Sequence, residues 1–240
     1  MNRDEVNHLL RQKLGEDVHR NGWVCYTGLD AIKKGRYYIM GYNPRIDPAN
    51  RSLLLSTKNL ENWSAYTMQC WNKSCKDDPC VHRDASGRLI EREIHQDRVV
   101  KLAGLLETRP ESIFSANAIF VESETAAQLR GARALWEKCW EVHKRFLAEV
   151  QPKWIICLGN GEERSSYSLL RRVADDPIAI PFPPDPARHP RYPHAKAFRA
   201  SFDIGGPSRM PVSVLGLPHP SRWGIPVRLQ EFIETEKMLG

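Results

Sequence analysis

Residues 36–44, with the sequence RYYIMGYNP, combine a short apolar and aromatic run with an abrupt end. The run stops at Gly41, and Pro44 cannot donate a backbone hydrogen bond to a ladder. This stretch therefore predicts a buried strand that leads directly into a functional loop. Three similar runs follow, at residues 113–120, at 154–158 before Gly159, and at 212–217 before Pro218. Because apolar residues occupy successive positions, the four runs predict parallel strands covered on both faces.

Helical patterns separate these runs. Apolar or aromatic residues recur at alternating intervals of three and four over residues 129–150, which predicts an amphipathic helix ending before Pro152. Thr125 and Gln128 resemble a capping box ahead of it. Two more helices are expected, within residues 89–107 and 226–239. Strands alternating with helices predict an α/β fold, a three-layer α/β/α sandwich around a central, mainly parallel four-stranded sheet.

The chain is expected to form a single domain over residues 1–240, with two irregular segments. Residues 45–88 are polar, aromatic and cysteine-containing without a sustained period, so we interpret them as an insertion after the first strand. Residues 177–226 hold twelve of the seventeen prolines. The part at 177–211 is therefore expected to be a proline-rich basic loop region, with one β-hairpin around Phe198 to Ile204.

The composition favours a polyanionic partner. The 240 residues include 35 Lys and Arg against 29 Asp and Glu, a formal net charge of +6. No stretch of ~18 apolar residues occurs, so neither a signal peptide nor a membrane span is expected, and the protein is expected to be soluble and cytoplasmic. In a reducing compartment Cys139 and Cys157 are interpreted as buried thiols. His143, on the apolar face of the long helix, is interpreted as a core histidine with satisfied hydrogen bonds.

Polar residues mark the ends of three expected strands. Gly41-Tyr42-Asn43-Pro44 follows the first, Asn117 lies in the second, and His219-Pro220-Ser221 follows the fourth. In doubly wound α/β folds the carboxyl ends of parallel strands form the ligand site. These side chains are therefore expected to gather along one edge of the sheet.

These two motifs resemble those of the uracil-DNA glycosylase superfamily, which has Gly-x-Asp/Asn-Pro after its first strand and His-Pro-Ser near the C-terminus. The chain is most similar to the branch of single-strand-selective monofunctional enzymes, which use Asn in the first motif. The resemblance covers the order of four strands over roughly residues 36–225 and about a dozen diagnostic positions. It implies a uracil-DNA glycosylase-like fold and a monofunctional DNA glycosylase that hydrolyses the N-glycosidic bond of a flipped pyrimidine, leaving an abasic site.

The resemblance also implies roles for individual residues. Asn43 would hold the attacking water through its carboxamide oxygen, and His219 would donate a hydrogen bond to O2 of the departing base. Asn117 would read the base edge through O4 and N3. The base pocket would consist of Gly41, Tyr42, Pro44, Arg45 and Asn117. The candidates for an aromatic ring stacked on the base are Tyr42, Trp63, Tyr66 and Trp71.

The chain departs from the family pattern at Arg45, where relatives usually place Gly or Tyr beside C5 of the base. The substrate is thus either uracil or a 5-substituted pyrimidine such as those in modified phage DNA, and the role either DNA repair or antiviral defence. After the second motif, Ser221, Arg222 and Trp223 are expected to contact DNA. Further DNA contacts are expected from the basic residues Arg188, Arg191, Lys196 and Arg199.

Two other interpretations stay open. The fold could serve a nucleic-acid- or nucleotide-binding module without catalysis. Alternatively, a zinc ion could be held by Cys70, Cys75, Cys80 and His82, as a structural metal or in a metal-dependent hydrolase, although this spacing is looser than in usual ligand pairs. The leading expectation is an enzyme without metal or other cofactor, acting on DNA as a monomer.

Overall fold

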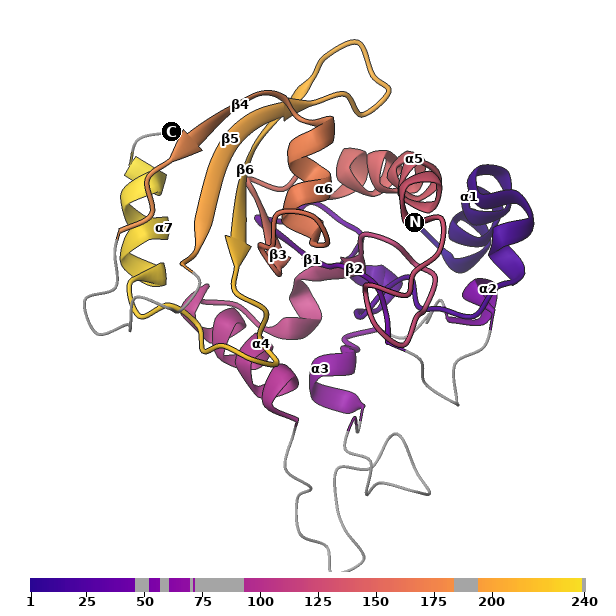
Figure 1. Cartoon of the computed structure of the whole chain (residues 1–240), viewed down its shortest axis with the longest axis horizontal. Helices are drawn as coiled ribbons and strands as arrows, with labels where there is room; N and C mark the ends of the chain where they lie inside the picture. The colour runs from indigo at the N-terminus through magenta and orange to yellow at the C-terminus, as the bar shows by residue number, and fades with distance from the viewer. Residues whose placement is uncertain (46–51, 57–60, 70, 72–92, 184–193, 239–240) are drawn as a thin grey trace, which may run out of the picture.

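The protein folds around one mixed sheet with the strand order β2-β1-β3-β6-β5-β4 (Figure 1). We describe a computed structural model, which covers residues 1–45, 52–56, 61–69, 71, 93–183 and 194–238. The strands are β1 (Tyr37–Gly41), β2 (Phe114–Asn117), β3 (Trp154–Leu158), β4 (Asp175–Ile180), β5 (Lys196–Phe202) and β6 (Met210–Leu217). The strands β2, β1, β3 and β6 are parallel, whereas β5 and β4 are antiparallel to their neighbours.

The four apolar runs of the sequence are the four parallel strands, as predicted. The expected count of four was wrong, because β5 and β4 extend the sheet to six strands. The expected hairpin exists as the pairing of β5 with β6. The strand β4 was missed because it contains Pro177 and is partly exposed, with Ile178 70% accessible. Proline is tolerated in an edge strand, and here a register shift between Asp175 and Ile178 accommodates it.

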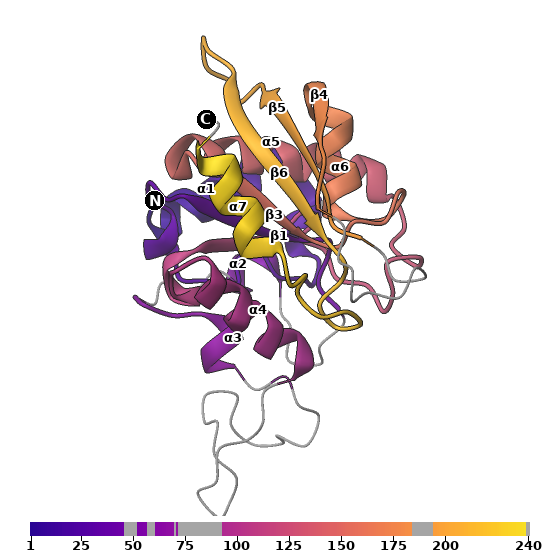
Figure 2. The same cartoon turned by 90° about the vertical axis from the view of Figure 1, so that its left-hand side faces the viewer.

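Helices cover both faces of the sheet, because successive strand residues point to opposite sides (Figure 2). Tyr38, Met40 and Cys157 belong to one buried cluster, together with residues of α1 (Arg3–Leu14), α5 (Ala132–Val150) and α6 (Ser166–Val173). Tyr37, Ile39 and Ile156 belong to the other cluster, with residues of α4 (Ile94–Leu105) and α7 (Leu229–Met238). Two cores on one sheet explain why the parallel strands are mostly apolar on both faces, with Ser115, Asn117 and Ser213 as polar exceptions.

The expected helices are present, with one shifted start. The helix α5 begins at Ala132 after Gly131 (φ 67°), while Thr125 and Gln128 form a side-chain hydrogen bond in a turn before it. The helices α4 and α7 lie within their expected ranges. The helix α1 was not predicted, although Asn2 and Glu5 form a capping box at its start. Short helices complete the described chain: η1 (Gly15–His19), η2 (Leu29–Ala31), α2 (Leu53–Ser56), α3 (Ala65–Met68) and η3 (Pro110–Ser112).

The interpretations of the buried core residues are confirmed. Cys139 and Cys157 are buried free thiols, and burial raises the pKa of each to about 12. His143 is fully buried, with its ring nitrogens within hydrogen-bond distance of Tyr38 Oη (2.7 Å) and Ala118 O (3.1 Å). None of the helices in the described ranges is long and apolar enough to cross a membrane.

Candidate active site at the carboxyl edge of the sheet

The loop after β1 is held along the segment that follows β2. Backbone N–H groups of Ala118 and Ile119 donate to the carbonyl oxygens of Gly41 and Tyr42, each at 2.8 Å. The N–H of Ser123 donates to Pro44 O at 3.1 Å. The parallel pairing of β1 with β2 therefore continues through the first motif, which fixes the backbone on both sides of Asn43.

The carboxamide of Asn43 has a defined orientation in this loop. Its Nδ2 donates to Ser123 Oγ at 2.8 Å and to Pro44 O at 3.0 Å. Ser123 Oγ in turn donates to Thr125 O at 2.8 Å, so the hydroxyl acts as an acceptor toward Asn43. With its donors committed, the amide leaves Oδ1 as an acceptor that has no hydrogen bond to the described part of the chain.

Asn117, at the end of β2, lies directly beside the first motif but is turned into the protein. It pairs in register with Gly41, and a Cβ placed on Gly41 would come within 2.6 Å of Asn117 Oδ1. Its Nδ2 donates to Trp23 O at 3.1 Å and to Tyr26 Oη at 3.2 Å. A larger residue at position 41 would displace the carboxamide of Asn117, whose Nδ2 donates to two protein acceptors.

His219 follows β6 in a tight turn that fixes its protonation. The backbone N–H groups of Arg222 and Trp223 both donate to His219 O at 3.0 Å. The N–H of Ser221 donates to Nδ1 at 3.2 Å, and Ser221 Oγ lies 2.7 Å from the same atom. A backbone N–H can only donate, so Nδ1 keeps its lone pair and the ring proton resides on Nε2.

The environment of His219 favours the neutral imidazole. Desolvation lowers the pKa of His219 from its usual value, and the charge of Arg222 lowers it further. His219 is nevertheless exposed as a residue, so it lies at the surface of the protein. His219 also lies over the end of β3, since a Cβ on Gly159 would be 3.8 Å from His219 Cδ2. A neutral ring with an Nε2–H group is a hydrogen-bond donor at the strand ends.

A row of aromatic rings connects Asn117 with His219 around this edge. Tyr26 stacks on Trp23 and on Tyr66, with ring centroids 5.9 and 5.6 Å apart. Trp71 meets Tyr66 at 5.5 Å and His95 also at 5.5 Å. His95 then meets His219 at 5.3 Å with the rings nearly perpendicular. We call this set the aromatic wall: Trp23, Tyr26, Tyr66, Trp71 and His95.

Two of the four aromatic candidates from the sequence belong to this wall, and two do not. Tyr66 is buried, with Oη 3.1 Å from Ser115 Oγ, whereas Trp71 is partly exposed. Trp63 is buried and makes none of the ring contacts seen among the described residues. Tyr42 packs against the core cluster on the α5 side, whereas the wall's Tyr66 and Trp71 pack with the α4 cluster. The sequence reasoning missed Trp23, Tyr26 and His95.

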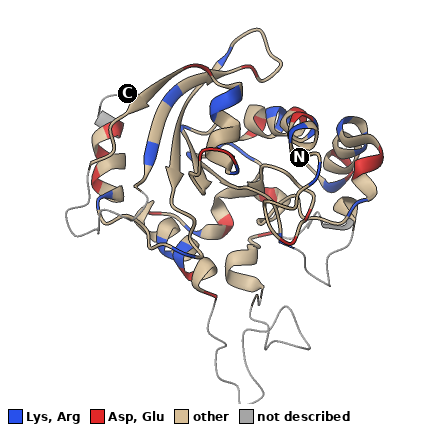
Figure 3. Ribbon diagram, in the orientation of Figure 1, with Lys and Arg blue, Asp and Glu red and all other residues tan. Residues whose placement is uncertain are grey.

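Lys and Arg are spread over helices and strands of the described chain (Figure 3), and the predicted DNA-contacting cations differ in the ion pairs that they form. Arg199 on β5 forms an ion pair with Glu236 on α7, away from the strand ends. Lys196, at the start of β5, lies 3.7 Å from Glu162 in the loop after β3. Arg45, Ser221 and Arg222 are exposed beside the two motifs, and Trp223 is partly buried. Arg188 and Arg191 lie outside the described residues, as do Cys70, Cys75, Cys80 and His82.

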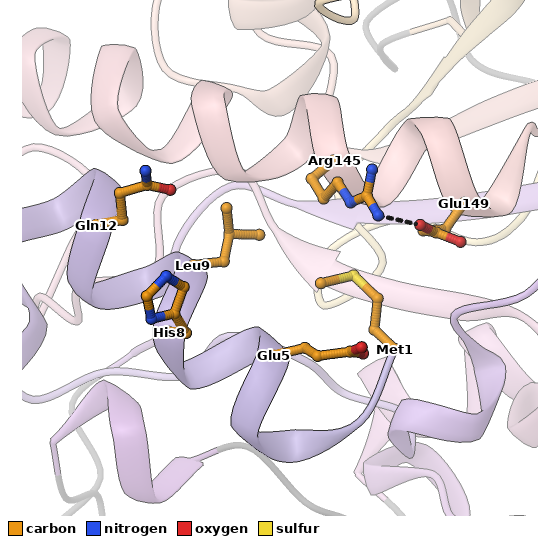
Figure 4. Close-up of a pocket in the computed structure, with 7 residues that line it drawn as sticks. All are labelled: Met1, Glu5, His8, Leu9, Gln12, Arg145 and Glu149. Carbon is orange, nitrogen blue, oxygen red and sulfur yellow. Dashed lines mark ion pairs between the residues drawn. The ribbon is translucent and has the colours of Figure 1, made fainter.

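A hollow of about 480 Å³ lies elsewhere, between α1 and α5 (Figure 4). Its charged groups are already paired within the protein, because Arg145 binds Glu149 at 2.8 Å and Glu5 accepts from the backbone of Asn2. None of its lining residues comes from the strand ends. We therefore assign this hollow no part in the candidate site.

The structure thus places the two motifs at the same carboxyl edge of the sheet, on strands β1 and β6, which are separated by β3. Over the described ranges, no group of three His, Cys, Asp or Glu side chains is arranged to hold a metal ion. Comparison with protein-family models finds no family that matches the chain, and comparison with curated proteins finds no similar sequence.

Proposed function

We propose that this protein is a monofunctional DNA glycosylase, which hydrolyses the N-glycosidic bond of a pyrimidine flipped out of DNA and leaves an abasic site. The helix-covered sheet agrees with the three-layer α/β/α sandwich that the resemblance to uracil-DNA glycosylases implies. DNA is the proposed partner, and the protein is proposed to act as a monomer.

One observation carries the proposal: the two motif side chains are fixed in opposite hydrogen-bonding roles at the same edge of the sheet, after strands that are separated by β3. Asn43 is held by its donor nitrogen, which leaves Oδ1 as the acceptor. His219 is held by its acceptor nitrogen, which leaves Nε2–H as the donor. Breaking the bond between C1′ and N1 needs this combination, because the sugar becomes positive while the base becomes negative.

The donor acts on the leaving group. As the C1′–N1 bond breaks, its electron pair moves to N1 and is delocalised onto O2. In the proposed complex His219 donates its Nε2–H hydrogen bond to O2 and remains neutral itself. A preorganised donor at a developing oxyanion commonly lowers the barrier by ~3 to 4 kcal/mol. Leaving-group stabilisation is therefore proposed as the larger catalytic contribution.

The acceptor acts on the nucleophile. Oδ1 of Asn43 accepts a hydrogen bond from water and directs its oxygen toward C1′. An amide is not an ionisable base, so the water attacks late, when C1′ already carries positive charge, and its proton passes to solvent. Neither motif contains a Lys that could form a Schiff base with the sugar. The proposed products are accordingly a free base and an intact strand with an abasic site.

The aromatic wall offers a surface for the flipped base. Trp23, Tyr26 and Trp71 are the partly exposed members of the wall that present large rings. Aromatic faces bind any pyrimidine by stacking and exclude water from the site. Asn117 supports the wall through Tyr26, so we propose that in the free protein it positions this ring, and that reading a base edge requires its amide to change partners.

The substrate proposal concerns C5 of the base. Arg45 is exposed next to Pro44, and its guanidinium can donate several hydrogen bonds to a hydroxylated or glycosylated 5-substituent. We propose a 5-substituted pyrimidine, with uracil as the alternative. Matched oligonucleotides that differ only at C5 test this: Arg45→Gly should reduce the preference for the substituted base by ~10-fold in kcat/KM, about 1.4 kcal/mol. If wild type cleaves uracil best and the ranking is unchanged in Arg45→Gly, uracil is the substrate.

The experiment that tests the function itself uses DNA with uracil, 5-hydroxymethyluracil or a glycosylated pyrimidine at one position. Free base is measured by mass spectrometry, and abasic sites are measured as alkali-labile breaks. Release of a base without strand cleavage before alkali supports the proposal. DNA binding without release of any of these bases would instead identify a non-catalytic binding module.

A further inference from the structure

The helix α4 contacts the loop after β6 at two successive residues, His219 and Pro220. His95 and Arg98 lie one helical turn apart, on the same face of α4. The ring of His95 meets the ring of His219 edge to face, with centroids 5.3 Å apart. Arg98 Nη1 donates to Pro220 O at 2.5 Å. In Figure 1 the chain after β6 runs directly over α4, in agreement with these contacts.

The carbonyl that Arg98 binds and the N–H that fixes His219 belong to the same peptide group. Pro220 contributes the carbonyl oxygen, and Ser221 contributes the N–H that donates to His219 Nδ1 at 3.2 Å. A hydrogen bond to the carbonyl oxygen polarises the peptide and strengthens its N–H as a donor. A donor that is itself a cation makes this effect larger.

We propose that Arg98 is a positioning residue that sets the tautomer of His219 through the Pro220–Ser221 peptide. The relay runs from the guanidinium to Pro220 O and from Ser221 N–H to Nδ1, and it keeps the proton on Nε2. This inference rests on the proposed function, because it names the residue that prepares the leaving-group donor. It adds a group on α4, outside both motifs, to the machinery of the site.

The physical argument is a competition for the Nδ1 lone pair. Both the Nδ1–H tautomer and the imidazolium place a hydrogen where the Ser221 N–H already points. The stronger that N–H is as a donor, the more both forms are disfavoured relative to the Nε2–H form. Two further charged or titratable described residues face His219: His95 from α4 and Arg222 from the same loop. Neither makes a described hydrogen bond to the Pro220–Ser221 peptide.

A second observation indicates that the contact between α4 and the His219 loop is functional, and it concerns His95. Its Nε2 is buried without a hydrogen bond to any described residue. A buried polar atom without a partner destabilises the fold, so a phenylalanine would be more stable in a purely structural role. His95→Phe is therefore the matched control, since it keeps a ring against His219 and leaves the Arg98 contact intact.

The test is a long-range ¹H–¹⁵N NMR spectrum of the histidine rings, recorded on the full chain without DNA. Wild type should show His219 as the Nε2–H tautomer alone. In Arg98→Met the Nδ1–H form should become detectable, with the pKa of His219 raised by ~0.5 units or more, the share of one weakened hydrogen bond. Arg98→Lys, which retains a charged donor, and His95→Phe should both keep the wild-type tautomer.

Arg98→Gln separates the hydrogen bond from the charge, because the amide of Gln donates to a carbonyl oxygen but carries no positive charge. A smaller share of the Nδ1–H form in Arg98→Gln than in Arg98→Met supports the relay, whereas equal shares in the two variants assign the effect to charge alone and overturn it. An unchanged tautomer and pKa in Arg98→Met would also overturn it. If melting shows that Arg98→Met does not fold, Arg98→Ala replaces it.

A kinetic measurement connects the relay to the reaction. With a substrate that wild type cleaves, Arg98→Met should lower kcat by ~3- to 10-fold with little change in KM, and Arg98→Lys should restore most of it. The spectra need no substrate, so a tautomer that responds to Arg98 in a protein that releases no base would refute the glycosylase proposal and leave the relay intact.

Discussion

Two histidines in different parts of the molecule show how burial separates structure from function. His143 lies in the core between α5 and the sheet, where both ring nitrogens have hydrogen-bond partners in Tyr38 and Ala118. His219 lies at the carboxyl edge of the sheet, where Nδ1 is held by Ser221 and Nε2 has no hydrogen bond to a described residue. Both ring nitrogens of His143 thus take part in hydrogen bonds within the fold, whereas Nε2 of His219 has no described partner and can bind a ligand.

The same contrast applies to amides and cations. Asn117 donates twice into the protein, whereas Asn43 keeps its oxygen available. Arg199 is paired with Glu236, whereas Arg222 is exposed beside His219. The polar atoms of a motif residue that have no hydrogen bond within the protein therefore indicate whether that residue can bind a ligand. Substitutions at both kinds of residue should separate the two roles, and the expected effects differ in size.

The largest effect is expected from removing the two side chains with spare polar atoms. His219→Ala should lower base release by about 10²- to 10³-fold, because it removes the preorganised donor at the developing negative charge, and Asn43→Ala should lower it by a smaller factor, because it removes the acceptor that orients the water. Neither side chain is fully buried, so the melting temperature should stay close to wild type. Single-turnover release of the base measures the loss, and wild-type release by either folded variant would contradict the proposed roles.

The second effect concerns stability and belongs to His143. Burial lowers the pKa of His143 from 6.5 to about 4. Between these values the unfolded chain binds a proton that the folded chain does not, so stability present above pH 6.5 is lost as the pH falls toward 4. The loss is about 3 kcal/mol for a difference of this size. Urea unfolding of wild type and of His143→Gln at pH 7 and pH 4.5 measures it.

The control for that experiment is a variant of His95, a second histidine that titrates in the same direction. Desolvation, and then the charges of His219 and Arg98, lower the pKa of His95 to about 3, so His95 adds a stability loss of the same sign. The variant His143→Gln should therefore still lose stability as the pH falls, by the amount that the substitution His95→Phe removes. A slope identical to wild type in His143→Gln would show that His143 is not the buried neutral group described above.

A smaller effect is expected from the support of Asn43. Ser123→Ala removes the acceptor that holds Asn43 Nδ2 and leaves the carboxamide itself in place. A hydrogen bond of this kind is worth about 1 kcal/mol, which corresponds to an about fivefold lower kcat. The matched control is Thr125→Ala, because Ser123 binds the backbone oxygen of Thr125 and not its side chain. Equal activities of both variants would mean that the orientation of Asn43 does not limit the reaction.

The parallel half of the fold could be predicted from the sequence because its signal is local and strong. Strands buried on both faces favour apolar residues at successive positions, and predominantly apolar runs of this kind appear four times. The strand β4 gives no such signal, because an edge strand that contains Pro177 and an exposed Ile178 reads as a loop. What decided its structure is pairing with β5, a contact that the order of residues does not reveal.

The candidate site was predictable only where it follows these strands. Asn43 and His219 stand next to strand ends, and a motif with a known geometry marks each. Trp23 and Tyr26 come from a segment that runs beside β2 through isolated bridges, without alternation or length to mark it as a strand. His95 is a single histidine in the first turn of α4. Its importance depends on contact with His219, which is remote in sequence.

The smallest expected effect separates a cation at the site from a cation in the fold. Each phosphate contact that is lost reduces the slope of log affinity against log salt by ~0.7 to 0.9, so Arg222→Ala should flatten the slope by about that amount. Arg199→Ala should leave the slope unchanged and lower the melting temperature instead, because Glu236 is largely buried and would lose its partner. Fluorescence anisotropy with single-stranded and duplex oligonucleotides between ~50 and 200 mM salt measures both slopes. Arg199→Ala could instead flatten the slope as much as Arg222→Ala does. In that case Arg199 leaves Glu236 to bind a phosphate when DNA is present. The hydrogen bonds and ion pairs of the free protein would then not predict which cations contact DNA.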